Sequence, residues 1–598
     1  MGNLKYFSLL MAAGMFAACS DNLENPGNEN DGPKTGEGYV KVAINLPSVS
    51  SSRAFNESTD LNDGDKSEYK VNTGIIAFFE GAKDGTEDKA KFVKAYDLGD
   101  LSKSNSDDID DNGTPDHIST TVTTILNVPK PAGDNKIYAL AILNNGSTDN
   151  IVSVNGQGNQ LTFYENTGDY IIINEGDNFK SLIDASWSID AATVSGTTDG
   201  FLMLNSPLYK TENSEKKIQT LVPVTVYDTE PNKDTTADKI FVERIVAKVD
   251  LELPASTSSN GKYTIPDGAY AGSEVIFTEA GSDLGWVLNV TNKTTKPVRD
   301  VSNYEDWSNT NSSYFFGTSV VNDSWCRIYW AKDNNYDKSY LKTGVNEPDM
   351  EKVNADFNVY SMDDETAVDG SKIKWGAYST TGEGAKVNAQ YCLENTDVAV
   401  LTGNVLNLNE YNITSVLIKT KFNIKKTGDA GEVDYSFFTI GDLANTYTKD
   451  QFLDYVAEKC SIATPHGLTI KEGAKAGYYE GAAELKNLIK GFTDTSHDTA
   501  LDNLGKVAYY LDGDCYYYAA PIQHFELTKP TGDITNENYL GKYGVVRNNW
   551  YNIKINKVSA PGLPEITEPV EPVEKEEGYI KCQINVLSWA KRQQSVDL

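Results

Sequence analysis

Apolar and polar residues alternate along many short stretches of this chain, a pattern typical of β-strands. In residues 38–48, Val40, Val42, Ile44 and Leu46 fall on one face, with polar or small residues between them. This alternation predicts a half-buried strand. The same reasoning predicts further strands at residues 74–79, 120–128, 137–143, 201–204, 218–227 and 240–253. Polar, turn-rich segments separate these strands, as in an antiparallel sandwich.

A Ser/Thr/Pro-rich break at residues 254–261 marks the expected boundary between two domains, at residues 54–254 and 255–559. The second domain has its own predicted strands at residues 274–278, 285–290, 415–422, 515–520 and 550–555. The prediction is therefore a mainly β protein with two sandwich domains.

Short helices are expected within the second domain. Thr448 and Gln451 form a capping box in front of an apolar i, i+3, i+4 face. A second apolar stripe, which ends before Gly491, consists of Leu485, Leu488 and Ile489. Both stripes indicate helices that face the core.

The N-terminus has the pattern of a lipoprotein signal peptide over residues 1–19. Lys5 precedes a largely apolar run at residues 6–18, which is too short to span a membrane. Small residues then lead into Cys19, the arrangement that lipoprotein signal peptidase needs, and the Cys19 thiol would carry diacylglycerol. An ordinary signal peptide, cut after an A-x-A-like site, is the alternative. The polar, acidic residues that follow indicate a solvated tether at the start of segment 20–53.

The C-terminus combines an extended arm with one more predicted strand. Residues 560–577 carry four prolines among glutamates, which keeps this arm extended and out of a sheet interior. In the following segment, residues 578–598, one face of the strand carries Ile580, Cys582, Ile584 and Val586.

Residues 578–588 repeat residues 38–48 in the same register. Gly, Tyr, Lys, Ile, Asn and Ser are identical, and the inward positions change with little change in volume. Two segments with one inward face fit the same groove but cannot fill it together. Chance similarity between two short strands is the alternative.

Two features between the copies fit an exchange of one strand for the other. Arg53 and Ala54, just after the first copy, form a site that a trypsin-like protease can cut. The arm before the second copy reaches about 55 Å at roughly 3.1 Å per residue. A 200-residue domain has a radius of gyration of about 16 Å. The second copy can therefore reach a neighbouring molecule.

With these features the chain resembles the fimbrillins of the Bacteroidales type V pilus family, most of all the shaft subunits of minor fimbriae. The resemblance rests on the lipobox at Cys19, the strand before Arg53, and the segments at residues 242–247, 546–551 and 595–598. Residues 300–500 match only in their strand-rich texture. Ser588 departs from the family, where a proline often precedes the tryptophan.

The resemblance implies two transthyretin-like antiparallel β-sandwich domains, with short helices and an extended C-terminal donor strand. It also implies a lipidated precursor at the outer membrane, from which an Arg-specific, trypsin-like protease removes the chain up to Arg53. The donor strand of another copy then takes the place of Val40, Val42, Ile44 and Leu46. Its implied contact residues are Tyr579, Ile580, Cys582, Ile584, Val586 and Trp589.

The implied function is that of a structural shaft subunit of a cell-surface fimbrium, which supports adhesion and biofilm formation. Its implied partners are other copies of the chain, joined head-to-tail, together with the pilus anchor and tip subunits. A tip subunit is expected to lack the donor tail and an anchor subunit to lack the cleaved strand. This chain has both features, which favours the shaft.

Composition and motifs argue against other functions. The chain of 598 residues has 86 acidic and 53 basic residues, a net charge of −33, so nucleic acid is not expected as a partner. Six widely spaced cysteines and four scattered histidines indicate neither a disulfide framework nor a zinc site. There is no G-x-x-x-x-G-K and no G-x-S-x-G motif, so we expect no catalytic residues and no enzyme.

One acidic segment has the spacing of a calcium loop. Oxygen ligands at loop positions 1, 3, 5 and 9 would come from Asp108, Asp110, Asn112 and Asp116. Ser119 stands where an EF-hand has its bidentate glutamate, so the pattern is incomplete. A solvated acidic loop is the alternative, and no other cofactor is expected.

A surface glycan-binding lipoprotein is the alternative function. It would use some of the 34 tyrosines and 8 tryptophans as platforms for sugars. It shares the lipobox and the acidity, but it does not explain the repeated strand, Arg53 or the proline-rich arm.

Overall fold

The protein is described by a computed structural model. The residues described are 36–45, 61–62, 68, 70–83, 85–101, 121–146, 151–196, 200–212, 215–232, 234–302, 326–345, 347–360, 373–378, 388–397, 401–402, 405–406, 410–424, 435–441, 445–519, 521–525, 540–567 and 589–597. Most of their regular structure is β-strand, which confirms the predicted mainly β class.

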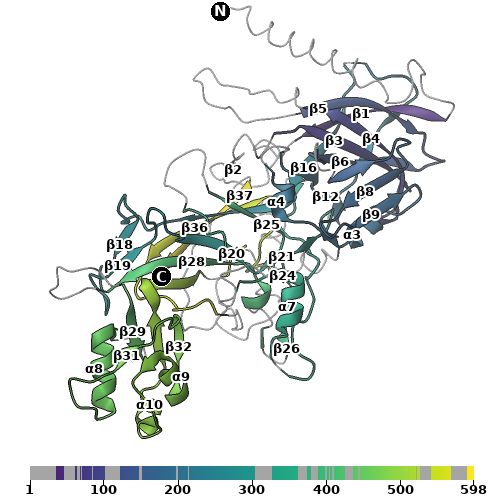
Figure 1. The fold of residues 1–598 in the computed structure, drawn as a ribbon. Helices are drawn as coiled ribbons and strands as arrows, with labels where there is room; N and C mark the ends of the chain where they lie inside the picture. Colours follow the sequence, from purple (N-terminus) through teal and green to yellow (C-terminus); the bar gives the residue numbers. More distant parts are fainter. Residues whose placement is uncertain are drawn as a thin grey trace, which may run out of the picture.

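A nine-stranded sheet forms the N-terminal region (Figure 1). Its main path runs β15-β1-β16-β11-β6-β3-β4, while β14 pairs with β6 and β5 with β1. The bounds are β1 Glu37–Asn45, β3 Thr73–Gly81, β4 Lys91–Asp100, β5 Thr121–Pro129, β6 Lys136–Leu143, β11 Met203–Asn205, β14 Val222–Val224, β15 Val226–Tyr227 and β16 Asp238–Arg244.

Smaller elements cover this sheet and share its hydrophobic core. A three-stranded sheet contributes Phe163 and Ile173 to that core, and the helix α3 contributes Leu182. The bounds are β7 Val152–Val154, β8 Gln160–Tyr164, β9 Tyr170–Asn174, η2 Glu87–Lys89, α3 Lys180–Asp184 and α4 Ala191–Val194.

Two five-stranded sheets pack face to face in the C-terminal region. One has the order β2-β37-β36-β17-β25, and the other runs β18-β19-β28-β20 with β35 on β28. Val249 and Ile553 of the first sheet and Ile418 of the second belong to one core, so this region is a sandwich. The bounds are β2 Leu61–Asn62, β17 Val246–Glu252, β25 Gln390–Leu393, β36 Asn549–Lys557, β37 Trp589–Asp597, β18 Lys262–Thr264, β19 Glu274–Ile276, β20 Gly285–Asn289, β28 Ser415–Asn423 and β35 Asp514–Ala519.

A small α/β unit is inserted between β28 and β35 and projects from the C-terminal sandwich (Figure 1). Its sheet has the order β30-β29-β34-β32, and it has a separate core around Phe438, Phe452 and Leu485. The bounds are β29 Phe437–Ile440, β30 Thr446–Thr448, α8 Lys449–Lys459, β31 Thr469–Ile470, β32 Gly477–Tyr479, α9 Gly481–Leu488, β33 Ile489–Lys490, α10 Asp498–Asp502, η6 Leu511–Gly513 and β34 Val507–Tyr510.

Short strand pairs join or decorate the two regions. β12 pairs with β13 and β23, and β10 pairs with β22, so segments of the N-terminal and C-terminal regions meet. The bounds are β10 Trp187–Ser188, β12 Leu208–Glu212, β13 Glu215–Gln219, β22 Thr294–Thr295 and β23 Cys326–Arg327. The remaining elements are β21 Thr291–Asn292, α7 Met350–Asp356, β24 Phe357–Asn358, β26 Leu401–Thr402, β27 Val405–Leu406 and η5 Glu410–Asn412.

The chain passes from the first region to the second at Ile245. A single strand was expected at residues 240–253, but the structure has β16 in the nine-stranded sheet and β17 in the C-terminal sandwich. Apolar residues continue on both sides of the crossing, so the sequence shows no break there. The change of sheet precedes the break expected at residues 254–261.

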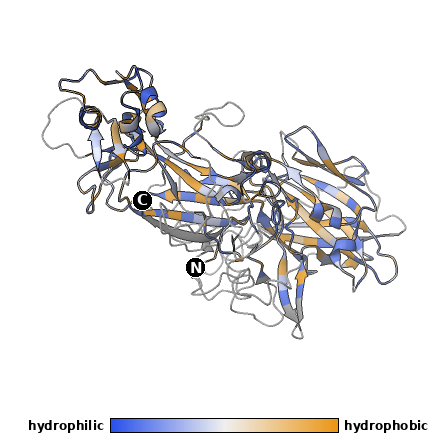
Figure 2. Ribbon diagram, turned by 90° about the horizontal axis from the view of Figure 1, so that it is seen from below, coloured by the Kyte–Doolittle hydropathy of each residue, from blue (hydrophilic) through white to orange (hydrophobic). Residues whose placement is uncertain are grey.

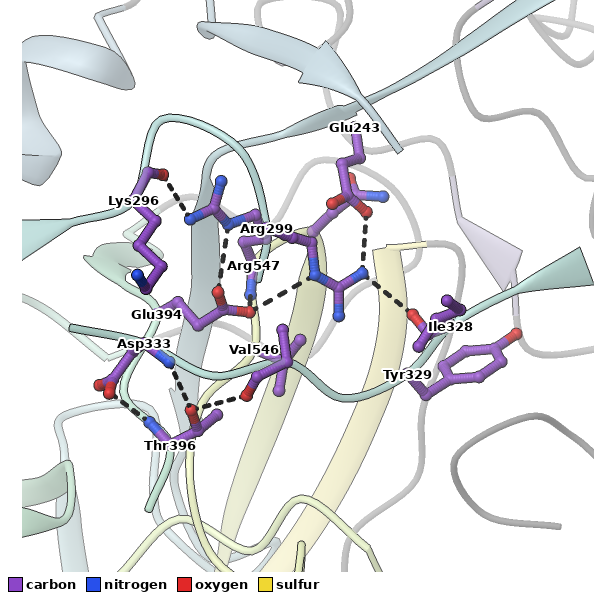
Figure 3. A network of polar contacts seen from close by, with 12 residues as sticks. Glu243, Lys296, Arg299, Ile328, Tyr329, Asp333, Glu394, Thr396, Val546 and Arg547 are labelled. Carbon is purple, nitrogen blue, oxygen red and sulfur yellow. Dashed lines mark hydrogen bonds and ion pairs between the residues drawn. The ribbon is translucent and has the colours of Figure 1, made fainter. Parts of the chain in front are cut away.

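Charged side chains are buried where the two regions meet (Figure 3). Glu243 of β16 lies 3.3 Å from Arg299, and Arg299 lies 3.7 Å from Glu394. Glu394 also pairs with Arg547 at 3.3 Å, and all four side chains are at most 3% exposed. Arg299 donates to the carbonyl of Ile328 as well. This network ties the N-terminal sheet to loops of the C-terminal sandwich.

The predicted strands and helices agree with the structure to different extents. The strands expected at residues 74–79, 120–128, 137–143, 415–422 and 550–555 are β3, β5, β6, β28 and β36. The capping box of Thr448 and Gln451 is present at the start of α8. Ile489 was expected to share a helical stripe with Leu488, but it begins β33 instead. Figure 2 shows apolar and hydrophilic residues alternating along the strands of both regions.

None of the helices in the described ranges is both long and apolar enough to cross a membrane.

Candidate assembly site around the first strand

β1 is hydrogen-bonded along both of its edges. It pairs antiparallel with β5 from Glu37 opposite Pro129 to Asn45 opposite Thr121. On its other edge the second half of β1 pairs parallel with β16, and its first half pairs antiparallel with β15. Taking β1 away would leave a gap between β5 and β16, with unpaired backbone groups on both sides.

The inward face of β1 is buried in the N-terminal core. Val40 and Val42 have no exposed surface and Ile44 has 1%. They share a cluster with Val128 of β5 and Ile240 of β16. Burying three such side chains stabilises the fold by about 1.5–3 kcal/mol each.

The outward face of β1 is also covered, so the prediction of a half-buried strand was wrong. Lys41 is 8% and Ala43 7% exposed. Lys41 Nζ donates to the carbonyl oxygens of Asn232 at 3.0 Å and Thr235 at 2.8 Å. Both carbonyls belong to the β15–β16 loop, residues 228–237, which therefore lies over β1. We call the space that β1 occupies between β5, β16, the core and this loop the β1 slot.

The turn in the β15–β16 loop is held by the side chain of Asn232. Its Oδ1 accepts hydrogen bonds from the backbone N–H of Asp234 at 2.9 Å and of Thr235 at 3.1 Å. Such an Asx turn fixes the backbone locally. The two carbonyl oxygens that bind Lys41 are thereby held in place.

Gly38 fits the β1 slot because it has no side chain. A Cβ at this position would lie 2.6 Å from Val226 Cγ1 and 2.9 Å from the carbonyl oxygen of Tyr227. The second distance involves backbone, which cannot move away cheaply. The slot therefore requires glycine at this position of the strand.

The end of the tail lies in the C-terminal sandwich of the same chain. β37 pairs parallel with β36, from Ala590 opposite Asn549 to Asp597 opposite Lys557, and pairs with the short strand β2 on its other edge. β36 is in turn parallel to β17, which follows β16 in the chain. β1 and β37 are thus both parallel to consecutive strands of one continuous path, β16 followed by β17.

Several residues predicted from the sequence lie outside the described ranges and remain predictions. They are Cys19, Leu46, Arg53, Ala54, Asp108, Asp110, Asn112, Asp116, Tyr579, Ile580, Cys582, Ile584 and Val586. Trp589 is the first residue of β37. In the part of the chain that is described, no three His, Cys, Asp or Glu side chains are grouped as a metal site.

Sequence reasoning missed the contacts on the outward face of β1. It treated Lys41 as solvent-facing and gave no role to Asn232 or Thr235. One signal was available, because lysine is identical at Lys41 and Lys581 whereas Ala43 is replaced by Gln583. An outward position kept in both copies indicates a specific contact.

The C-terminal part of the chain matches a known protein family. Residues 508–595 match the family described as major fimbrial subunit protein type IV, fimbrillin, C-terminal. The match includes β35, β36 and most of β37. No curated protein matches the chain significantly in sequence.

Three solved structures have some similarity to the chain. A protein described as a cell adhesion protein of Parabacteroides distasonis is 11% identical, with a TM-score of 0.30, over 94% of this chain and 99% of that chain. The tip fimbrial protein Mfa3 of Porphyromonas gingivalis is 11% identical, with a TM-score of 0.24, over 67% of this chain and 85% of that chain. A fimbrial assembly protein of Parabacteroides distasonis is 11% identical, with a TM-score of 0.22, over 65% of this chain and 96% of that chain.

The matched family is one of fimbrial subunits, which are structural proteins. Residues 508–595 match the C-terminal region of this family, in agreement with the resemblance to fimbrillins seen in the sequence.

Proposed function

We propose that this chain is a fimbrial shaft subunit that polymerises by donor-strand exchange. Proteolysis after Arg53 releases β1 from its slot, and residues 578–588 of another copy enter. The observation that carries the proposal is that the second copy of the repeat meets the requirements of the β1 slot, position by position.

Each requirement has a matching residue in the second copy. Gly578 corresponds to Gly38, where a Cβ has no room. Ile580, Cys582 and Ile584 correspond in order to the buried Val40, Val42 and Ile44. An unrelated strand can meet the apolar positions by chance, but it will rarely have glycine in the same register as well.

The energetics favour occupation of the slot by a strand. An emptied slot exposes apolar core and two unpaired strand edges, which folded proteins avoid. An added strand covers the apolar core and pairs with both strand edges. Its main-chain hydrogen bonds give affinity, and the sites for its side chains give specificity. The contact joins unlike surfaces of two copies, so it continues into a filament and does not close as a dimer.

The tail must move together with the donor strand. Residues 578–588 and β37 are consecutive in the chain, so β37 leaves its own β36 when the donor strand enters another subunit. In the receiving subunit, the β1 slot and the edge of β36 follow the parallel path of β16 and β17. We propose that the incoming tail uses this edge after the donor strand has filled the slot.

The proposal includes the steps before assembly. The precursor is lipidated at Cys19 and held at the outer membrane, and an Arg-specific protease cuts between Arg53 and Ala54. Anchor and tip subunits end the filament, which supports adhesion and biofilm formation.

The test compares polymerisation of charge variants after cleavage. Ile584→Asp places a carboxylate at the buried position of Ile44 and should abolish polymerisation, while the uncleaved precursor remains folded. The matched control Val573→Asp changes an apolar residue of the arm outside the repeat and should polymerise normally. Arg53→Ala gives an uncleaved, monomeric reference. Size-exclusion chromatography and electron microscopy measure the polymer.

Equal polymerisation of Ile584→Asp and Val573→Asp would refute the exchange. Lys581→Asp is unsuitable as the neutral control, although periodicity suggests it, because Lys41 at the equivalent position is buried against two carbonyls.

A further inference from the structure

We infer that Lys581 fixes the register of the incoming donor strand by placing its ammonium group on the carbonyl oxygens of Asn232 and Thr235 of the receiving subunit. This inference rests on the proposed donor-strand exchange. It assigns Lys581 and the β15–β16 loop as the specificity-determining pair of the joint.

The first observation is the environment of Lys41 in the β1 slot. Lysine is almost never buried without partners, and Lys41 at 8% exposure has two carbonyl oxygens at 3.0 and 2.8 Å. Hydrogen bonds from a charged donor are shorter and stronger than those between neutral groups. The slot therefore contains a preformed site for an ammonium group, and cleavage of β1 would leave this site empty.

The second observation is that the apolar pattern alone does not define the register. A slip of one residue turns the apolar face outward, which the core excludes. A slip of two residues keeps the apolar face inward, with Cys582 in the place of Val40 and Ile584 in the place of Val42. The core positions accept such near-isosteric exchanges at little cost. The apolar positions therefore do not distinguish these two registers.

Only the unshifted register places a cation at the carbonyl pair. A slip of two in either direction brings Tyr579 or Gln583 to the position of Lys41. Neither side chain carries a positive charge. The same slips also replace glycine at the position of Gly38, where a Cβ would lie 2.9 Å from a backbone oxygen. Lys581 thus favours the unshifted register because its ammonium group is attracted to the carbonyl pair. Gly578 favours the same register because any other residue at the position of Gly38 would collide with the backbone.

The charge of the receiving loop fits a lysine. The β15–β16 loop contains Asp228, Glu230 and Asp234. One of them, Asp228, forms an ion pair with Lys130 at 2.6 Å, near the first residue of β1. A carboxylate at residue 581 would meet both this acidic loop and two carbonyl oxygens, so Lys581→Asp should be more harmful than simple removal of the charge.

The test uses the full chain with one substitution that keeps the length of the side chain. Lys581→Met removes the ammonium group and keeps an unbranched apolar stem. After cleavage, it should polymerise at least about tenfold more slowly, as expected for loss of charge-assisted hydrogen bonds. Lys581→Arg keeps the charge and should recover part of the rate. Thermal unfolding of the uncleaved precursors should be unchanged, because β1 itself fills the slot there.

Cross-linking between subunits reads the register directly. Ala43 lies opposite Thr123 in the pairing of β1 with β5, and Lys41 lies opposite Ile125. In a Cys582→Val background, Gln583→Cys should form a disulfide with Thr123→Cys and not with Ile125→Cys. In Lys581→Met, part of the cross-link should move to Ile125→Cys, because the loop no longer disfavours the two-residue slip and only the crowding at the position of Gly38 still opposes it.

The outcomes separate this inference from the proposed function. If wild-type filaments cross-link at neither position, the donor strand does not occupy the β1 slot and the proposed function fails. If they cross-link at Thr123→Cys but Lys581→Met polymerises equally fast with the same single cross-link, the exchange stands and the role of Lys581 is wrong. Asn232→Ala, which loosens the turn, should slow polymerisation of wild type more than of Lys581→Met, since effects of coupled residues are not additive.

Discussion

Gly38 occupies a position of the β1 slot where even a methyl group collides with backbone. If Gly578 enters the same position, Gly578→Ala should slow polymerisation strongly while the precursor keeps its stability. The neighbouring substitution Glu577→Ala, one residue before the repeat, serves as the control and should have little effect. Polymerisation kinetics after cleavage measure the difference, and similar rates for both variants would contradict the shared register.

A second buried residue, Glu87, gives the fold a pH dependence. Its carboxylate accepts hydrogen bonds from the backbone N–H of Thr220 and Leu221, both at 2.9 Å. Burial nevertheless raises the pKa of Glu87 from 4.5 to about 7. Between these values the folded state binds more protons than the unfolded state, so stability falls as the pH rises through this window.

Glu87→Gln removes this titration and should change the pH profile. The free energy of unfolding of Glu87→Gln relative to wild type should rise by up to about 3 kcal/mol between pH 4 and pH 8. The pKa of buried Asp333 is also raised to about 7, but Asp333 is present in both proteins and cancels in the comparison. Denaturant unfolding at the two pH values provides the measurement. A pH-independent difference would show that Glu87 does not titrate in this range.

Residue roles were predictable to the extent that they follow from alternation. Val40, Val42 and Ile44 face the core as their spacing indicates. The burial of Lys41 depends on a loop 191 residues away in the sequence, and alternation carries no information about such a cover. The same limit applies to the crowding at Gly38, which arises from Val226 and Tyr227 of another strand.

At the scale of elements, strands marked by an apolar run or by alternation were predicted well, and the order of strands in the sheet was not. β3, β5 and β6 stand out by local pattern, but their order in the sheet depends on pairing between distant segments. The expected strand at residues 218–227 is divided among β13, β14 and β15, and Pro223, which has no N–H to donate, lies within it. The face of a strand on which a residue lies was therefore easier to predict than the strands that pair with it.

The buried ion network holds elements of the two regions together, and it gives a prediction at this scale. Glu394→Gln leaves Arg299 and Arg547 without their shared carboxylate. Breaking a buried ion pair in this way costs about 3–5 kcal/mol of stability. The control Glu279→Gln removes a long surface contact with Lys421 at 4.0 Å and should cost less than about 1 kcal/mol.

Unfolding by denaturant measures the stability of both glutamate variants. A transition for Glu394→Gln that separates into two steps would indicate that the network couples the two regions. A loss of stability no greater than that of Glu279→Gln would show that the buried network is energetically neutral.

At the scale of the whole molecule, the inserted α/β unit is separable from the assembly site. The backbone N–H of Gly441 donates to the carbonyl of Lys506 at 3.0 Å, so the chain enters and leaves most of this unit at one point. Phe437 and Tyr510 face the sandwich core, whereas Phe438 and Tyr509 face the separate core of the unit. The antiparallel pair of β29 and β34 therefore forms the boundary.

Excision of residues 442–505 should preserve assembly. Gly441 would be joined to Lys506 through an Asn-Gly turn, with Phe438→Thr and Tyr509→Thr to cover the exposed hairpin face with polar groups. The shortened chain should fold and, after cleavage, polymerise at a rate similar to that of the full chain. Circular dichroism and polymerisation kinetics test this. A folded but assembly-deficient product would show that the inserted unit takes part in the joint.

The placement of β1 in its slot also determines how the proposed filament would bear a pulling force. A donor strand in this slot is bonded along both edges and covered on both faces, as β1 is. Tension along the filament would pull such a strand lengthwise, so the ladders on both edges carry the load in shear and must break together. A strand held at one edge would instead peel away one bond at a time. Because forced separation depends on the rate of that event and not on equilibrium stability, a joint of this kind resists flow at a cell surface better than its binding energy alone suggests.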